Sequence, residues 1–594
     1  MKNIFLIFSF VTLLFFSSCE SLTDSLDTTI DSTLNPDYVF TQVELTKDAI
    51  DGIKIPFGET NSYRGRYIPY YGFNTDVEWY HSLKLGEEKS ELCMYDTTTT
   101  NPQMNTANNV WSQMYSGIER ANICIQGIRQ YGNPTANNEM GMLLGQALTL
   151  RAIYYADLLK TWGDVPARFE PVTEGTVYLA KSNRDIIYKQ IIADLGEAAE
   201  LTPWPNATPY TSSVERINKA FVKGLRAKLA LAASGYQQYP DGLRRSNDSE
   251  LTVEKMYSLA LKECRDVIES GTCKLESSFE TLWKKYNQEV VTAGGESLWE
   301  IPFADGRGRV AYSFAVKHTS IDQFQGQAKG GSAGLLPTVF YDYDQADTRR
   351  DVTCVPYKYG VADAKKIAKQ ELGSSDIWYF GKYRYEWMTR YVTSDQDDGL
   401  NKIYMRYAEV ILMAAETANE LEGATAAAPY LKLLRNRAFP TALQAVKVDA
   451  YVNALTTKPA MFNAIVDENK FEFAGEMERK QALIRWNLLK VKLDEAKTKM
   501  TNWKDRTGEY VDVPTTLYYK YAADNVSLTI YGLNRGETTN PGSAYTAFSW
   551  NKLEAEKIDL LYNSSVDPNN KQFWPIWQVF IDASNKLLVN DYGY

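Results

Sequence analysis

The sequence predicts a mostly α-helical fold in which helix pairs stack along the chain. Two observations support this prediction. Apolar residues recur at helical spacing in one segment after another, and short turns join neighbouring segments into pairs. With 594 residues, the chain is also long enough to bury a sizeable core in one large helical array.

Residues 401–423 form the clearest predicted helix. Their apolar side chains recur along one face, and neither Pro nor Gly interrupts the pattern before Gly423, which is a natural C-terminal stop. A second helix is predicted over residues 429–440 after a short turn, so the two segments form a helical hairpin. One face of this hairpin is therefore expected to belong to the core.

The charged residues of this predicted helix indicate a role in the scaffold. Arg406 and Glu409 lie three positions apart, so they are neighbours on the helix surface, where they can pair or tie helices together. Glu416 and Glu420 lie one turn apart and are expected to face solvent. We therefore do not expect ligand contacts from this segment.

Further amphipathic segments predict the rest of the helical scaffold, which spans about residues 37–290 and 400–490. Repeated helix pairs are typical of tetratricopeptide-like stacking, although no strict repeat of about 34 residues aligns along the chain. The additional predicted helices cover residues 110–128, 140–162, 183–201, 214–236, 253–270 and 461–490.

Three stretches depart from the helical pattern. Residues 61–109 are rich in Tyr, Asn, Thr and Gly, and glycines break any helix in a loop-rich insertion over about residues 291–399. Inside this insertion, residues 297–303 (SLWEIPF) are predicted to form a strand. Long non-helical excursions usually carry function. Residues 491–594 are predicted to be an irregular C-terminal segment, and residues 19–594 are interpreted as one domain.

The N-terminus carries a targeting signal. A basic residue precedes an apolar run over residues 4–16 that is too short to span a membrane comfortably, and small residues lead from it to Cys19. This arrangement resembles a bacterial lipoprotein signal, which implies removal of residues 1–18 and lipidation of Cys19. The alternative is a plain secretory signal with a chance cysteine. Glu20 and Asp24 resemble the acidic tether that directs lipoproteins of the Bacteroidetes to the cell surface.

The composition argues against several classes of protein. Lys and Arg number 64 against 74 Asp and Glu, and the resulting net charge of −10 leaves no basic footprint for a nucleic acid partner. No other run of the sequence could cross a membrane, so lipid is the only expected anchor. Of six cysteines, the five beyond Cys19 are sparse and include no CxxC pair, so we expect buried thiols.

No catalytic motif stands in the context that its chemistry requires. Residues 330–334 match GxSxG, but a nucleophile elbow needs a later His, whereas His81 and His318 both precede Ser332. These two histidines lie far apart without an HExxH motif, so no metal site is expected. Residues 306–308 lack the third glycine of a dinucleotide fingerprint. We expect no cofactor and no catalytic residue, although counting carboxylates does not exclude a glycosidase pair, which is defined by its separation in space.

Six segments carry a pattern when they are taken in order. They are VWSQMYSGIERANICIQGI from residue 110, LRAIYYADLLKTWGDVP from 150, DQADTRR from 344, residues 403–420, EFAGEMERKQALIRW from 472, and the C-terminal WPIW with NDYGY. Each segment alone is weakly specific. Together, behind a lipoprotein signal, they resemble the SusD/RagB family of surface lipoproteins over nearly the whole mature chain. One departure is Met477, which stands where the family pattern usually has Gly.

This resemblance implies both a fold and a function. Family members are built on tetratricopeptide-like helix pairs, present a loop-rich face to ligand, and act as a lid over a TonB-dependent SusC-like transporter at the outer membrane. They are not enzymes; many bind glycans, and some belong to peptide-uptake systems. We therefore expect a non-catalytic, glycan-binding lipoprotein at the cell surface. The alternatives are a surface-anchored glycan hydrolase and a peptide-binding member of the same uptake class.

The candidate ligand site combines aromatic and polar residues of the loop-rich stretches. Sugar rings stack their C–H faces on Trp and Tyr, while their hydroxyls bond to Asn, Asp and Arg. The NTDVEWY segment over residues 74–80 has this character, and the resemblance implies that the stretch before the residue 110 helix often lines the site. Trp79 is the first candidate, and its alternative role is packing beneath the loop. The candidate binding residues are Trp79, Tyr80, Asn74 and Asp76, with Tyr312 and Phe324 opposite them in the insertion.

Overall fold

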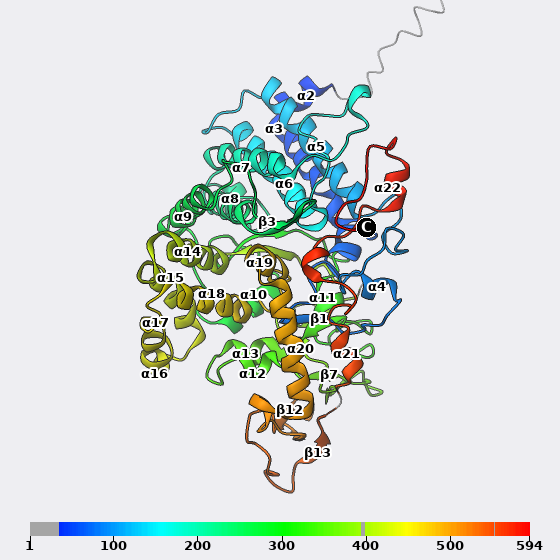
Figure 1. Cartoon of the computed structure of the whole chain (residues 1–594), viewed down its shortest axis with the longest axis vertical. Helices are drawn as coiled ribbons and strands as arrows, with labels where there is room; N and C mark the ends of the chain where they lie inside the picture. Colours follow the sequence, from blue (N-terminus) through cyan, green and yellow to red (C-terminus); the bar gives the residue numbers. More distant parts are fainter. Residues whose placement is uncertain (1–34, 394–397, 552) are drawn as a thin grey trace, which may run out of the picture.

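The computed structural model describes residues 35–393, 398–551 and 553–594. Its helices stack in pairs down one side of the molecule, from α2 (Pro36–Thr41) at the top of Figure 1 to α15 (Ala424–Ala438) at the left. The small sheets and short helices of the loop-rich insertion lie beside this array. The mostly α-helical fold with tetratricopeptide-like pairs is confirmed.

The long helices of the array pack against one another in chain order. They are α5 (Val110–Tyr131), α6 (Glu139–Trp162), α7 (Arg184–Leu201), α8 (Lys219–Ser234), α9 (Val253–Glu269), α14 (Tyr407–Glu422), α15 and α18 (Lys458–Phe473). Each of α5 to α8 contacts the next helix, and α9 contacts α14, which in turn contacts α15 and α18. The array therefore continues across the insertion that separates α9 from α14 in the sequence.

Side-chain caps explain where several of these helices begin. Each capping oxygen accepts a hydrogen bond from a backbone N–H that the first turn of a helix leaves without a partner. The predicted helices over residues 110–128, 140–162, 183–201 and 253–270 are confirmed to within a few residues. The capping residues are Asn109 of α5, Asn138 of α6, Asn183 of α7, Asn218 of α8, Thr252 of α9 and Thr457 of α18.

The helix predicted over residues 401–423 is wrong in its first part. Lys402–Arg406 form strand β10, which pairs antiparallel with β4 (Ser297–Ile301), and α14 begins only at Tyr407. The strand predicted in the insertion is confirmed by β4. The start of the predicted helix is a strand because its backbone groups bond to β4 and not within a helix.

The charged residues around α14 also differ from the prediction. Arg406 and Glu409 do not pair with each other, because the Glu409 carboxylate lies 2.9 Å from a lysine of α8. Glu416 is buried, and its carboxylate accepts hydrogen bonds from Arg485 Nη2 at 2.6 Å and from the Trp486 indole at 2.9 Å. Glu420 is exposed, as predicted. The prediction for Glu416 fails because α14 is covered by α9 on one side and α18 on another.

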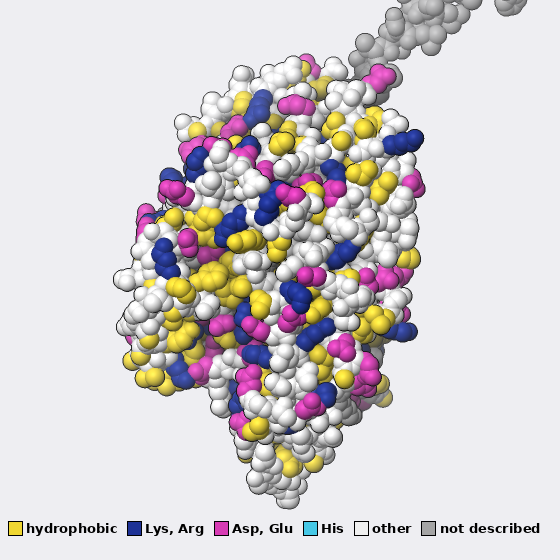
Figure 2. Space-filling model, viewed as in Figure 1, with side chains coloured by type: hydrophobic (Ala, Val, Ile, Leu, Met, Phe, Trp, Pro, Cys, Tyr) yellow, Lys and Arg dark blue, Asp and Glu magenta, His cyan; other side chains and the backbone are white. Residues whose placement is uncertain are grey.

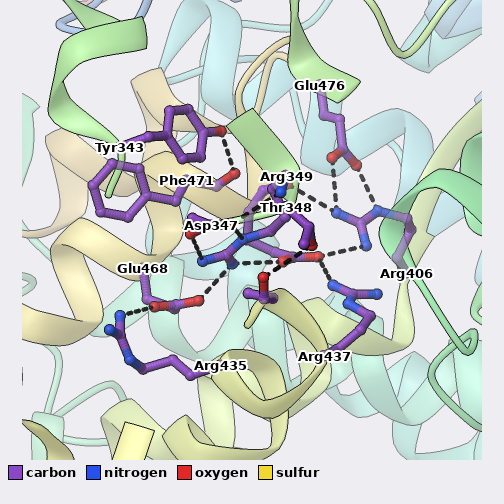
Figure 3. A network of polar contacts seen from close by, with 12 residues as sticks. Tyr343, Asp347, Thr348, Arg349, Arg406, Arg435, Arg437, Glu468, Phe471 and Glu476 are labelled. Atoms are coloured by element: carbon purple, nitrogen blue, oxygen red, sulfur yellow. Dashed lines mark hydrogen bonds and ion pairs between the residues drawn. The ribbon is translucent and has the colours of Figure 1, made fainter. Parts of the chain in front are cut away.

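A buried ion network joins the insertion to the helical array (Figure 3). Arg349 of the insertion lies 2.5 Å from Glu468 and 2.9 Å from Glu472, two carboxylates of α18. Arg406 of β10 lies 2.6 Å from Glu296 and 2.7 Å from Glu476. The remaining partners are Asp347 on Arg349, Arg435 on Glu468, Lys382 on Glu476, and Arg437 on Glu296 and Glu472.

The network holds its carboxylates in the charged form. Burial alone would raise the pKa of Glu472, but Arg437, Arg406 and Arg349 together lower it well below the usual value. Burial would likewise raise the pKa of Glu476, and Arg406 and Lys382 lower it. Removing one cation would therefore leave buried carboxylates with less compensating charge.

The helix predicted over residues 461–490 is interrupted after Phe473, where α18 ends. Next come α19 (Arg479–Arg485) and α20 (Leu489–Asp505). Gly475 has φ +85° and Met477 has φ +67°, both in the left-handed region that an α-helix does not use. A residue with a Cβ costs about 1–2 kcal/mol there. This backbone favours Gly, the residue that the family resemblance implies at the position of Met477.

The sheets are small and antiparallel. The largest, with strand order β12–β11–β13, lies in the C-terminal segment that the sequence analysis predicted to be irregular. The strands are β1 (Glu78–Tyr80) with β5 (Ala333–Leu335), β2 (Gln237–Tyr239) with β3 (Gly242–Arg244), β6 (Cys354–Val355) with β9 (Tyr379–Phe380), β7 (Tyr357–Tyr359) with β8 (Gln370–Leu372), and β11 (Thr516–Tyr521) with β12 (Leu528–Tyr531) and β13 (Thr546–Ser549).

Two further features of the described residues bear on function. The five cysteines among them are free and buried, as predicted. Within these ranges, no helix combines the length and the apolarity that crossing a membrane requires. Cys19, Glu20 and Asp24 lie outside the described residues.

We predict that Arg406→Ala destabilises the protein by about 3–5 kcal/mol, because it removes a buried cation shared by Glu296, Glu472 and Glu476. The measurement is urea denaturation followed by circular dichroism. Arg265→Ala is the matched control. Arg265 also forms a bidentate ion pair, with Glu422, but this pair lies on the surface. The control should lose no more than about 1 kcal/mol. Equal losses in the two variants would contradict a special role for the buried network.

Candidate functional site

The two loop-rich stretches meet where β1 pairs with β5. Residues 330–334, which we call the Gly-rich loop, hold this junction together. His81 N donates to Ser332 O at 3.0 Å on one side of this loop. On the other side, Gly330 N donates to Tyr312 O at 3.0 Å, and Ser332 N donates to Ser313 O at 3.0 Å. The stretch over residues 61–109 and the insertion therefore share one structural unit.

Glycine is required in this loop for a packing reason. A Cβ on Gly334 would lie 1.9 Å from the backbone oxygen of Trp378 and 2.4 Å from Nε2 of His81. Gly330 adds a left-handed backbone, with φ +83°. Close approach of the backbone thus explains the glycines of the GxSxG match. The helix that a nucleophile elbow needs directly after its Ser does not follow Ser332 in the described chain.

A tyrosine–arginine cluster forms at this junction; we define it as Arg66, Tyr70, Tyr80, Arg309 and Tyr312. Tyr80 ends β1, is partly exposed, and contacts Tyr70 edge-on with ring centroids 5.9 Å apart. Burial raises the pKa of Tyr70, and the positive charges of Arg66 and Arg309 act in the opposite direction. Arg309 thus acts electrostatically on Tyr70, and its guanidinium also lies over the ring of Tyr312.

Tyr312 lies on α11 (Val310–Phe314) and is partly exposed. Cζ of Arg309 lies 4.0 Å from the centre of its ring, and Nζ of Lys329 lies 3.6 Å from it. Such cation–aromatic contacts hold a ring in place. The backbone N–H of Tyr312 donates to the buried Asp398 carboxylate at 2.7 Å, which fixes the start of α11. The Tyr312 ring is therefore partly exposed and lies against two cationic side chains.

Trp79, the first candidate of the sequence analysis, is fully buried, with 0% of its side chain exposed. Strand alternation places it on the opposite face of β1 from Tyr80. No acceptor among the described residues lies within hydrogen-bonding distance of its Nε1, and Lys557 Nζ lies 5.1 Å from the ring centre. The alternative weighed for Trp79, packing beneath the loop, is the arrangement that the structure has.

Asn74 and Asp76 hold the loop in shape. Asn74 has φ +62°, donates through Nδ2 to Leu561 O at 2.9 Å, and accepts from Tyr80 N at 3.1 Å. Asp76 pairs with Arg479 through contacts of 2.7 and 2.8 Å. Both side chains are thus already engaged within the protein, and Asn74 holds the backbone of Tyr80.

Phe324 lies in a separate small core of the insertion, where its ring contacts His318 at 5.9 Å and Tyr359 at 5.4 Å. Of the six candidates, Tyr80 and Tyr312 are therefore the two that the Gly-rich loop brings together. The residues predicted from the sequence did not include Arg66, Arg309 or Lys329. The available signal was the mixture of Arg and Tyr in YRGRY from residue 63 and in the segment leading to Tyr312.

No metal cluster accompanies this site. Among the residues that the structure describes, no three His, Cys, Asp or Glu side chains gather as a metal ion would require.

A buried acid lies two residues before Tyr80, on the same face of β1. Glu78 is fully buried, and its Oε2 accepts a hydrogen bond from Gly475 N at 2.6 Å. Burial raises the pKa of Glu78 to about 8, from an ordinary value of 4.5. Between these two pH values, the folded protein binds a proton that the unfolded chain releases. The stabilising contribution of protonated Glu78 is therefore complete below about pH 4.5 and is lost as the pH rises through 8.

We predict that Glu78→Gln flattens the dependence of stability on pH, because glutamine mimics the protonated acid. Between pH 5 and 8.5, the free energy of unfolding of the variant should fall less than that of the wild type, by on the order of 2–4 kcal/mol. Urea denaturation across this range measures the difference. The exposed Glu420→Gln is the control and should leave the pH dependence unchanged. Parallel curves for wild type and Glu78→Gln would refute the shifted titration.

Comparison with known proteins places these features in a family. The model of the SusD family matches residues 296–594, and a model described as starch-binding and associating with the outer membrane matches residues 37–231. One SusD-like protein of Formosa agariphila is 23% identical over 416 residues, which is 65% of this chain and 71% of the relative. Another is 22% identical over 511 residues, or 82% of this chain and 92% of the relative.

Solved structures share the fold. A SusD homologue from Bacteroides thetaiotaomicron has a TM-score of 0.71 at 19% identity and covers 96% of this chain and 99% of its own. Surface glycan-binding protein A from the same organism, solved in complex with laminarihexaose, has a TM-score of 0.59 at 19% identity and covers 92% of this chain and 99% of its own.

Proposed function

Because the chain belongs to the SusD family, we propose that it is a cell-surface lipoprotein that binds oligosaccharide or polysaccharide without catalysis and delivers it to a TonB-dependent SusC-like transporter in the outer membrane. The observation that carries the glycan assignment is the tyrosine–arginine cluster, where partly exposed rings and cationic side chains meet on the loop-rich part of the molecule. The partner transporter follows from the family resemblance.

The chemistry of the cluster suits sugar recognition. The exposed part of Tyr80 offers an apolar surface to the C–H face of a sugar ring, and guanidinium N–H groups are suited to donate to sugar hydroxyls. The neighbouring backbone is held by the β1–β5 pair and by Asn74, so little ordering accompanies binding. A related protein that shares the fold was solved with a bound glucan hexasaccharide, which supports the same ligand class here.

Binding without hydrolysis is the simpler assignment. A glycosidase needs two carboxyl groups that flank the scissile bond. The carboxylate that contacts Tyr312 belongs to Asp398, which is buried and accepts from a backbone N–H. The nearby His81 is also buried, and its ring is held against the Gly331 carbonyl at 3.0 Å. These contacts favour a structural role for both groups.

We predict that Tyr80→Ala and Tyr312→Ala each weaken glycan binding by about 1–3 kcal/mol, the scale of burying one large side chain. Calorimetry with a panel of glycans and peptides, using protein that lacks residues 1–19, measures this effect. Tyr178→Ala is the control, since it also removes a tyrosine ring, one that is 50% exposed elsewhere on the surface.

Two outcomes of this experiment would change the assignment. Release of reducing ends from a glycan incubated with the wild type would show a hydrolase. Saturable binding to peptides, with none to glycans, would show the peptide-binding alternative.

The lipid anchor has its own test, because Cys19 lies outside the described residues. We predict that the wild type sediments with outer membranes and is cut by protease added to intact cells. Cys19→Ser should shift the protein into the soluble fraction, since one thiol carries the expected lipid. Glu20→Gln is a control that keeps the cysteine and should still sediment. A membrane-bound, lipid-labelled Cys19→Ser protein would refute the anchor.

A further inference from the structure

The C-terminal sheet has two chemically different faces. It lies at the bottom tip of the molecule in Figure 1 and in the space-filling view of Figure 2, and there β12 and β13 flank the central strand β11. Alternation along the strands defines an inner face, whose side chains pack against the main core. The inner-face residues that pack there are Leu517, Tyr519, Leu528, Ile530 and Phe548.

The outer face carries two neighbouring tyrosines. Tyr518 of β11 lies directly opposite Tyr531 of β12, so their Cβ atoms are expected about 4.5–5.5 Å apart. On its other side, Tyr518 faces the small Ala547 of β13. Both tyrosine side chains are partly exposed, and neither belongs to the set that packs against the core. We define Tyr518 and Tyr531 as the outer-face pair.

The outer-face pair has no structural partner to explain it. Within the described part of the chain, neither hydroxyl makes a hydrogen bond and neither ring contacts another ring or a cation. The other side chains of this face are small or polar, and one of them, Lys520, is charged. The remaining residues of the face are Thr516, Thr529, Ala547 and Ser549.

The backbone beneath the pair is rigid. Directly after Tyr531, the backbone N–H groups of Gly532 and Asn534 donate to one carboxylate oxygen of Glu537, at 3.0 and 3.1 Å. Gly532 has φ +97°, so the chain turns sharply there. At the other end of β12, the N–H of Leu528 donates to Gln370 Oε1 at 2.8 Å, which ties the sheet to β8.

This arrangement has the features of a carbohydrate platform. Tyrosine rings on a flat, fixed strand pair present apolar faces for C–H stacking, and neighbouring threonine and serine hydroxyls offer hydrogen bonds to sugar hydroxyls. A small alanine beside Tyr518 leaves space for a ligand to approach. The near absence of charge suits a neutral polymer better than a charged partner.

We propose that the outer face of β11–β13 is a second glycan-contact surface, at which the outer-face pair binds a neutral polysaccharide that also occupies the tyrosine–arginine cluster. This inference rests on the proposed glycan-binding function. A chain long enough to reach both surfaces binds more tightly than a short one, because the second contact becomes intramolecular. A short oligosaccharide gains nothing from the platform.

The test compares long and short ligands on the Tyr518→Ala/Tyr531→Ala double variant of the full mature chain. Affinity electrophoresis uses laminarin, amylopectin, xylan and galactomannan, and calorimetry uses the hexasaccharide that matches the polysaccharide bound by the wild type. The matched control is Tyr38→Ala/Tyr178→Ala, which removes two tyrosines that are 55% and 50% exposed elsewhere. Thermal denaturation checks that both double variants are folded.

The platform variant should lose about tenfold or more in affinity for the long polysaccharide and keep its affinity for the hexasaccharide, whereas the control should change neither. Equal polysaccharide affinity in wild type and platform variant would overturn the second surface but leave the proposed function in place. A matching loss in the control would also overturn it. Failure of the wild type to bind any of the four polysaccharides would overturn both.

Discussion

A buried ion network around Glu472 is the interaction on which the rest of the structure depends. Arg349 from the insertion, Arg406 from β10 and Arg437 from α15 converge on this carboxylate. Each ion costs several kcal/mol to remove from water, and the mutual attraction offsets this cost only when every partner is in position. The network therefore favours the one arrangement in which strand, helix and insertion come together, and it penalises arrangements in which any of them is displaced.

The position of the loop-rich face follows from this constraint. The insertion is tied to α18, and in this position its strand β5 can pair with β1. Strand β1 lies far earlier in the sequence, in the stretch over residues 61–109. Gly334 permits the close approach that this pairing needs. Tyr80 and Tyr312 then lie on either side of the same Gly-rich loop. Irregular segments thus form a site because a regular scaffold holds their ends.

Local signals predicted the helical array well. The apolar stripes of α5, α6 and α7 repeat within one or two turns, so they are visible in the sequence. Strand β10 was missed because its conformation depends on β4, which lies far away in the chain. The burial of Glu416 was missed for the same kind of reason, since a helix stripe does not reveal how many neighbours cover it.

The candidate site shows a similar division. Composition pointed to residues 61–109 and to the insertion, and these stretches do meet at the β1–β5 pair. It did not reveal which ring of the Trp79–Tyr80 pair faces outward, because a shift of one residue along a strand exchanges its faces. Composition also did not predict that Arg309 and Lys329 contact Tyr312. These contacts form only when the Gly-rich loop folds back on α11.

By itself, the sequence determined the positions of most long helices, the acidic balance and the family pattern, because these are properties of neighbouring residues or of the whole composition. Only the tertiary structure decided that Trp79 is buried, that Tyr80 meets the insertion, and that Tyr518 and Tyr531 share an outward face. The physical reason is that burial and strand pairing are set by contacts between segments far apart in the chain, and no local pattern encodes which of those contacts form.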